Sequence, residues 1–165
     1  MSASRHRFRR WLYRHGRPNG LARLMIRPDA ALFSAGILAH RAATLQVPGR
    51  RTGRLVSVPV VVTDYEGERY LVSMLGERAN WVHNVRAAGG RAVLRHGRRE
   101  AVGLAEVHPA VRAPILRRYL AVAPGARAHI PVDRRAPLEE FDRIAAQFPV
   151  FLVTTGDQDA GGTLP

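Results

Sequence analysis

The arginine-rich turn Gly49-Arg50-Arg51-Thr52-Gly53-Arg54 carries the residue types best suited to binding an anion. Its two glycines let the chain reverse and expose backbone N–H groups, while adjacent guanidinium groups and a hydroxyl group offer charge-assisted hydrogen bonds to phosphate. The same pattern describes a solvated hairpin tip, which is common in a chain this rich in arginine. The turn by itself therefore leaves two interpretations open, a phosphate site and a solvated turn.

A second candidate is the segment Ser73-Met74-Leu75-Gly76-Glu77-Arg78-Ala79-Asn80-Trp81. It leaves an expected strand and enters an expected helix through a glycine, so free backbone N–H groups should lie at a helix N-terminus beside an indole. A planar ring that carries carbonyl and imide groups can use both features. The alternative is a helix capped by Asn80, with Trp81 in the hydrophobic core.

Side chains that could move a proton are few. His83 follows on the same expected helix, and Tyr119 carries a phenolic proton; both are candidate proton donors, with structural packing as the alternative for each. Asn84 is expected to tie this helix to a strand by side-chain hydrogen bonds. The chain has no cysteine and its seven histidines lack metal-ligand spacing, so we expect no metal site.

The elements that must position these residues are mainly strands. Runs of β-branched residues alternate with turn signals, and the first two turns predict two consecutive hairpins in an antiparallel meander. The expected strands are 44–47, 55–63, 69–74, 92–95, 99–107 and 148–155, and the expected helices are 30–39, 80–89, 109–124 and 138–147. Helices set outside such strands predict an α+β, mainly antiparallel fold built on a small barrel or strongly curled sheet.

Length and composition fit one domain. The chain has 165 residues, of which 46% are hydrophobic, enough to bury a proper core. We expect a basic amphipathic arm at residues 1–28, a barrel domain at 29–155 and a flexible tail at 156–165. No apolar run approaches the ~20 residues that span a bilayer, and no signal-peptide pattern is present, so we expect a cytoplasmic protein.

The net charge of +13 comes largely from the arm, because residues 1–28 contain eight arginines and no acidic residue. The rest of the chain carries 13 − 8, or +5, which argues against a nucleic-acid partner. Within residues 4–15, Phe8, Trp11 and Leu12 share one helical face opposite the arginines. This pattern predicts either contact with an anionic membrane or packing of the arm on the barrel.

Five short motifs follow one another between residues 42 and 155. They are a Gly-Arg-(Lys or Arg)-(Ser or Thr)-Gly turn at 49–53, Ser57 shortly before Pro59, a strand-end loop with glycine at 73–76, a Trp-x-x-Asn-x-Arg-Ala run at 81–87, and Pro-Val-Phe at 149–151. In this order and spacing the chain resembles the deazaflavin-dependent nitroreductase and quinone reductase family. Members of that family have a split β-barrel and use the reduced coenzyme F-420.

The resemblance implies roles for particular residues. Arg50, Arg51 and Thr52 would grip the phosphate and acidic tail of the deazaflavin, with Arg54 and Ser57 nearby. Backbone groups of three residues would face the ring, and two further side chains would shape the pocket beside it. These are Ser73, Met74 and Gly76 for the ring, and Trp81 and Asn84 for the pocket.

The resemblance also implies an activity. A hydride would pass to a small flat acceptor such as a quinone, a nitroaromatic compound or an enone, and such a transfer depends on positioning more than on acid–base side chains. Two alternatives use the same residues. One is an FMN-dependent reductase, and the other is a non-catalytic carrier of a cofactor or lipid-like ligand.

Overall fold

The structure is a computed structural model that describes residues 40–156. The predicted arm at 1–28, the predicted helix at 30–39 and residues 157–165 of the predicted tail lie outside the described residues. Within 40–156, no helix has the length and apolar character needed to cross a bilayer.

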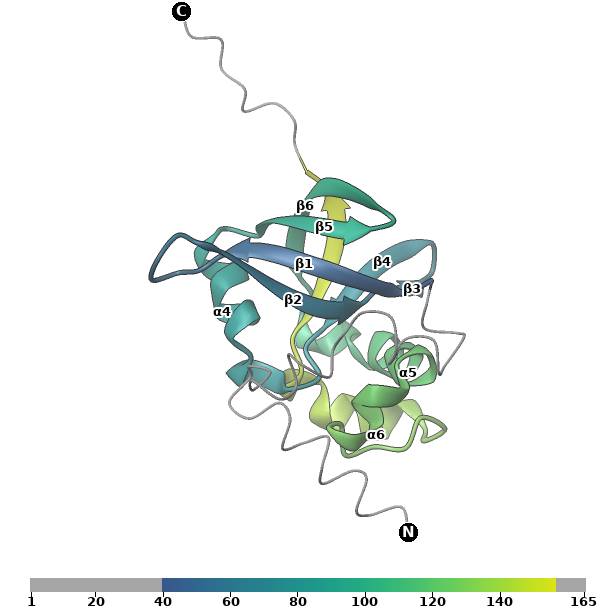
Figure 1. Cartoon of the computed structure of the whole chain (residues 1–165). Coiled ribbons are helices and arrows are strands. Elements are labelled where there is room, and N and C mark those ends of the chain that lie inside the picture. The colour runs from purple at the N-terminus through teal and green to yellow at the C-terminus, as the bar shows by residue number, and fades with distance from the viewer. Residues whose placement is uncertain (1–39, 157–165) are drawn as a thin grey trace, which may run out of the picture.

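Seven strands form one curled sheet in which every neighbouring pair is antiparallel (Figure 1). Their order across the sheet is β2-β1-β5-β6-β7-β4-β3. The strands are β1 (Ala42–Pro48), β2 (Leu55–Val61), β3 (Thr63–Tyr65), β4 (Glu68–Val72), β5 (Arg91–His96), β6 (Arg98–Glu106) and β7 (Val150–Thr155). Together with the flanking helices, this sheet confirms the predicted α+β split-barrel class.

Both predicted hairpins are present, but the long strand that they share is bent. Its first half is β2, which pairs with β1, and its second half is β3, which pairs with β4. The two halves therefore lie at opposite edges of the sheet. The Val62 N–H still donates to the Arg41 carbonyl oxygen, in the register of the β1–β2 ladder, whereas the next residue, Thr63, already pairs with Tyr70 of β4. The bend brings β2 into contact with β4, so the sheet curls toward a barrel.

The first core cluster fills the inside of the curl. Alternate residues of β1, namely Ala43, Leu45 and Val47, point inward, and Leu94 of β5 and Phe151 of β7 meet them there. These five side chains are at most 8% exposed. The residues between them on β1 face outward, as the period of two in the sequence predicts.

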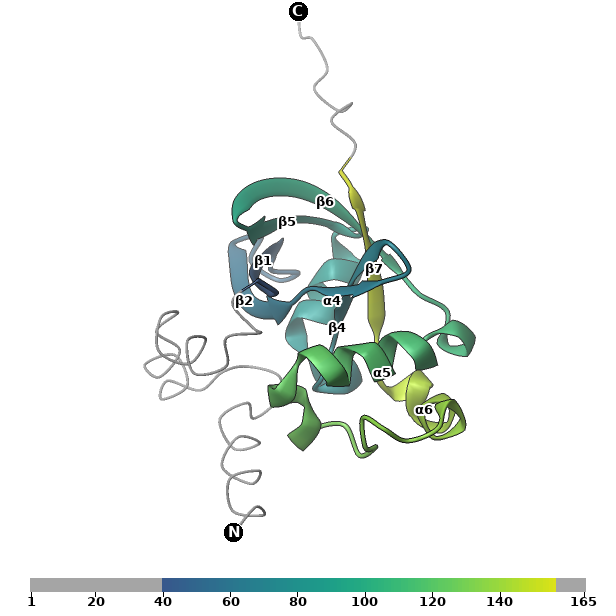
Figure 2. The same cartoon turned by 90° about the vertical axis from the view of Figure 1, so that its right-hand side faces the viewer.

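Three α-helices pack against the sheet, and they are α4 (Asn80–Ala87), α5 (Ala113–Val122) and α6 (Leu138–Ile144). Helix α4 closes one end of the curl, while α5 and α6 lie together at the other side (Figures 1 and 2). A second core cluster, with Leu116, Leu120 and Phe141 at its centre, joins α5 and α6 to β3, β4 and β7.

Two predicted helix starts are corrected by the structure. Asn80 does not cap α4, because it is the first helical residue and Ala79 takes the cap position without a side-chain bond. The helix expected from Pro109 begins later, at Ala113, after a short 3-10 turn over Pro109–Val111 in which the His108 side chain accepts the Ala110 N–H.

Candidate functional site

The arginine turn, residues 49–54, is a compact loop between β1 and β2. The Gly49 N–H donates to the Arg54 carbonyl oxygen at 2.8 Å, and the Gly53 N–H donates to the Gly49 carbonyl oxygen at 2.8 Å. Gly53 has a φ of +68°, a left-handed conformation that favours glycine. The Thr52 Oγ1 accepts the Arg54 N–H at 3.3 Å. These bonds fix the loop while the arginine side chains remain exposed.

Arg50 ties this turn to α4. Its backbone N–H and its Nη1 both donate to Asn84 Oδ1, at 3.2 and 3.0 Å, and its Nη2 donates to Asn80 Oδ1 at 3.4 Å. Asn84 is 4% exposed, so its oxygen is a buried acceptor that the arginine satisfies. Asn84 was predicted to tie the helix to a strand; in the structure it ties the helix to the turn after β1 instead. Figure 1 shows the β1–β2 turn projecting beside α4.

The charge of the turn is not neutralised within residues 40–156. Both side-chain acceptors of Arg50 are neutral amides, and no carboxylate of this range pairs with Arg50, Arg51 or Arg54. Three guanidinium groups without a counter-ion, on a loop of fixed shape, fit a phosphate or carboxylate group. This arrangement favours the anion-binding interpretation of the turn over the solvated one.

The glycine turn, residues 73–76, precedes α4. The Ser73 N–H donates to the Pro149 carbonyl oxygen at 2.9 Å, the Ser73 hydroxyl donates to the Gly76 carbonyl oxygen at 2.8 Å, and the Gly76 N–H closes the turn on the Ser73 carbonyl oxygen at 3.0 Å. The N–H groups of Met74 and Leu75, at its centre, find no acceptor within the described range. They are partly buried donors that a ring carbonyl could accept from.

Gly76 is required by two features of this turn. Its φ is +70°, and a Cβ built on it would lie 2.8 Å from the Gln147 carbonyl oxygen. Any side chain would therefore both strain the backbone and push against a main-chain atom. The glycine lets the turn lie directly on the segment that leads into β7.

Trp81 lies on α4 within the core. It is 8% exposed, and its ring centroid is 5.5 Å from that of Phe151 with the planes tilted by 54°. This edge-inclined arrangement is typical of aromatic packing in cores. Trp81 thus anchors α4 to β7, shortly after the glycine turn in the sequence.

Three other predicted site residues, His83, Ser57 and Tyr119, come from different parts of the fold. His83 is half-buried on α4, between the helix residues Val82 and Asn84. Ser57 is exposed on β2, where its Oγ accepts from Gln46 Nε2 at 3.3 Å on the outer face of the sheet. Tyr119 is 3% exposed in the second core cluster, against which Met74 also packs. Arg50, Asn84 and the glycine turn are thus brought together around the start of α4, while Ser57 and Tyr119 come from other faces.

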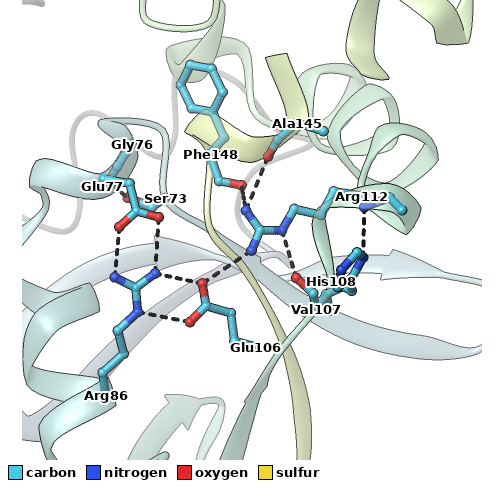
Figure 3. A network of polar contacts seen from close by, with 11 residues as sticks. Ser73, Gly76, Glu77, Arg86, Glu106, Val107, His108, Arg112, Ala145 and Phe148 are labelled. Atoms are coloured by element: carbon cyan, nitrogen blue, oxygen red, sulfur yellow. Dashed lines mark hydrogen bonds and ion pairs between the residues drawn. The ribbon is translucent and has the colours of Figure 1, made fainter. Parts of the chain in front are cut away.

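An ion-pair network behind the glycine turn was missed by the sequence reasoning. Arg86 of α4 donates to Glu77 at 2.7 and 3.1 Å and to Glu106 at 2.9 and 2.7 Å (Figure 3). Arg112 donates to the same Glu106 at 3.2 Å. Arg86 falls within the Trp-x-x-Asn-x-Arg-Ala run, which was the one signal in the sequence, while nothing local marks Arg112.

The network keeps its carboxylates ionised. Hydrogen bonds from Arg86 hold the pKa of Glu77 and the pKa of Glu106 below the ordinary glutamate value. Those two glutamates in turn raise the pKa of Arg86. Burial lowers the pKa of Arg112, and the negative charge of Glu106 acts in the opposite direction. The four groups therefore act as fixed charges and not as proton carriers.

The sequence profile of the F-420H(2)-dependent quinone reductase family matches residues 34–138. No curated protein matches the chain.

Several solved structures are similar. One is described as an F-420-H2 dependent reductase, FDR-A, with 18% identity over 68% of this chain and 93% of that chain and a TM-score of 0.46. Another is an FAD-binding protein from Mesorhizobium loti, with 15% identity over 78% and 91% and a TM-score of 0.46. A heme binding protein from Mycobacterium smegmatis has 16% identity over 78% and 52% and a TM-score of 0.48.

Proposed function

This chain belongs to the F-420H(2)-dependent quinone reductase family and is therefore an oxidoreductase with the deazaflavin F-420 as cofactor, and we propose that its physiological acceptor is a quinone. When bound, the deazaflavin supplies a hydride to the acceptor. A nitroaromatic compound or an enone is the same kind of flat, electron-poor acceptor. The observation that carries the proposal is a turn with three arginines that pair with no carboxylate of residues 40–156, one of which, Arg50, docks on α4, the helix that follows a turn with two free N–H groups.

The arginine turn would hold the anionic end of the cofactor. Arg51 and Arg54 are exposed and unpaired within the described range, and Arg50 is already oriented by Asn84, so little side-chain freedom is lost when Arg50 binds phosphate. The Thr52 hydroxyl proton remains free to donate while its oxygen accepts within the turn. Ser57 lies on the outer face of β2, away from this turn, so its place in the site rests on the resemblance alone.

The glycine turn would hold the ring. The Met74 and Leu75 N–H groups are the donors for ring carbonyls, and Ser73 and Gly76 supply the internal bonds that keep those donors in place. Leu75 of this turn packs against the first core cluster, to which Trp81 belongs.

Protonation of the reduced product needs one side chain that can donate a proton. His83 lies half-buried on α4, next in the sequence to Asn84, whereas Tyr119 is buried among the helices, so we favour His83 as the donor. Orientation of the two flat reactants would supply most of the rate, because well-oriented reactants gain about 7–11 kcal/mol over free ones.

The first experiment is a titration of the purified protein with F-420, FMN and FAD, followed by anaerobic mixing of the F-420H(2) complex with menadione. We expect selective binding of F-420 and oxidation of the cofactor by the quinone. Binding of F-420 without turnover of any acceptor would favour a carrier instead. Affinity for FMN alone would contradict the proposal.

The second experiment tests the anion site with a matched pair of variants. Arg50→Ala with Arg51→Ala should weaken F-420 binding about tenfold or more for each charge-assisted bond lost. Arg134→Ala with Arg135→Ala removes two adjacent exposed arginines from the loop between α5 and α6 and should leave affinity unchanged. Equal affinity of both double variants would remove the arginine turn from the site.

We also propose that residues 4–15 bring the enzyme to the cytoplasmic face of an anionic membrane, where lipophilic quinones reside. The support is the sequence pattern of Phe8, Trp11 and Leu12 opposite arginines. Full-length protein should co-sediment with vesicles that contain an anionic phospholipid, and Phe8→Gln, Trp11→Gln and Leu12→Gln together should abolish this. Binding that survives the triple substitution would contradict the proposal.

A further inference from the structure

On the side of α4, one side chain, that of Glu77, links the glycine turn to the rest of the protein by hydrogen bonds. Glu77 follows Gly76 directly, and both of its oxygens accept from Arg86, at 2.7 and 3.1 Å. Glu77 has no other hydrogen-bond or ion-pair partner within residues 40–156. Arg86 is held in turn by two bonds to Glu106 of β6, at 2.9 and 2.7 Å. The main chain also connects the turn to α4, where the Ala79 N–H donates to the Gly76 carbonyl oxygen at 3.3 Å. Among the polar side chains of residues 40–156, the link from the turn to α4 and β6 passes through the Arg86 guanidinium group.

The opposite side of the turn is fixed by Arg112. Its side chain is 4% exposed, and its Nη1 donates to the carbonyl oxygens of Ala145 and Phe148, both at 3.2 Å. Those carbonyls flank Gln147, whose own carbonyl oxygen is the main-chain atom against Gly76. Arg112 also donates to Glu106 at 3.2 Å, so one carboxylate connects both sides (Figure 3).

These contacts fix the residue that follows the turn and the segment against which Gly76 lies, and the two free donors of the proposed ring site belong to that same turn. From this geometry we infer that Arg86 is a positioning residue which, through Glu77, holds the Met74 and Leu75 N–H groups where the cofactor ring needs them. Glu106 and Arg112 fix the surface on which the turn lies. The inference rests on the proposed function, because it assigns a role to that same site.

A contribution to the global stability of the fold does not account for the ion pair between Glu77 and Arg86. The Glu77 side chain is 48% exposed and that of Arg86 is 37% exposed, and pairs this exposed contribute little to global stability. Their effect is instead local, on a turn that carries no other side-chain link to α4. Displacement of a reacting group by about 1 Å can lower a rate about 100-fold, so a weak tie at this place can control turnover.

The first test uses the protein without cofactor. Hydrogen exchange of the Gly76 N–H, which closes the turn on Ser73, should become faster by up to about fivefold in Glu77→Gln, the range expected for an exposed ion pair. The control is Glu100→Gln, since Glu100 also accepts from two arginines, Arg69 and Arg98, but lies on β6 away from the turn. In Glu100→Gln, the hydrogen-exchange rate of the Gly76 N–H should match that of the wild type.

The second test separates binding from turnover. With F-420 saturating and menadione as acceptor, Glu77→Gln and Arg86→Lys should lower kcat about 10- to 100-fold, because the ring is misplaced. The Kd for F-420 should stay close to that of the wild type, because the anionic end is held by the arginine turn. Arg50→Ala with Arg51→Ala should show the converse, a raised Kd with kcat retained at saturation.

The outcomes distinguish this inference from the proposed function. Wild-type protein that neither binds F-420 nor reduces menadione would refute the proposed function itself. Normal wild-type turnover with unchanged kcat and unchanged Gly76 exchange in Glu77→Gln would refute the positioning role alone. A lowered kcat in Glu100→Gln of equal size would also refute it, since any lost ion pair would then suffice.

Discussion

Substitution of Gly76 by alanine tests whether the glycine turn is built as described. The residue has a φ of +70°, and an added Cβ would lie 2.8 Å from the Gln147 carbonyl oxygen. The left-handed conformation costs a non-glycine residue roughly 1–2 kcal/mol. Because the opposing atom belongs to the main chain, relieving the contact requires a backbone shift that costs about 1–3 kcal/mol more. We expect Gly76→Ala to lower the free energy of unfolding by about 2–5 kcal/mol.

Gly97→Ala provides the matched control. Gly97 joins β5 to β6 with a φ of +73°, and nothing lies within 4 Å of an added Cβ. Its substitution should therefore cost only the conformational part, roughly 1–2 kcal/mol. The difference between the two variants isolates the contact with Gln147.

Urea denaturation of both variants and the wild type, followed by circular dichroism, measures these free energies. Gly76→Ala should also lower kcat at saturating F-420, because the Met74 and Leu75 N–H groups move with the turn. Equal destabilisation by the two variants would refute the close approach of the turn to Gln147. Full stability of Gly76→Ala would refute the left-handed conformation as well.

Three further predictions follow from the charges. Asn84→Asp places a carboxylate on the oxygen that accepts from Arg50 at 3.0 Å, so calorimetric titration should show weaker F-420 binding without loss of thermal stability. Arg112→Met leaves buried carbonyl oxygens unsatisfied and should cost about 3–5 kcal/mol in urea denaturation, whereas Arg117→Met, at an exposed position, should cost little. The pKa of Glu77 lies below its ordinary value of 4.5, so its ion pair stabilises the fold above that pH and is lost as pH falls through the folded pKa. The stability difference between wild type and Glu77→Gln should thus be constant at neutral pH, stay below about 1 kcal/mol and vanish in acid.

Most local structure was predictable because it depends on neighbouring residues. Alternation of apolar residues predicted β1 and its inward face, and the glycines after Glu66 and His96 marked tight turns. The helix through Trp81 was expected from its spacing and from the two glycines that end it. Both candidate turns were identified from residue type alone.

Three features of the site were outside the reach of such patterns. Asn84 accepts from Arg50 across 34 positions of sequence, and Arg112 reaches Phe148 across 36. The Arg86 network draws its members from a loop, a helix and a strand, so no period in the sequence connects them. The place of Trp81 in the core rather than on the surface also depended on Phe151, which arrives from the last strand.

The sequence by itself determined the strands, the turns, the position of α4 and the family resemblance, since each depends on residue types and spacing over a few positions. Only the tertiary structure decided that the strand through Val62 bends to opposite edges of the sheet, that Arg50 docks on α4, and that Arg86 holds the glycine turn. The physical reason is that these contacts join segments that are far apart in the sequence. Such segments come together only when the whole sheet curls to bury the common core.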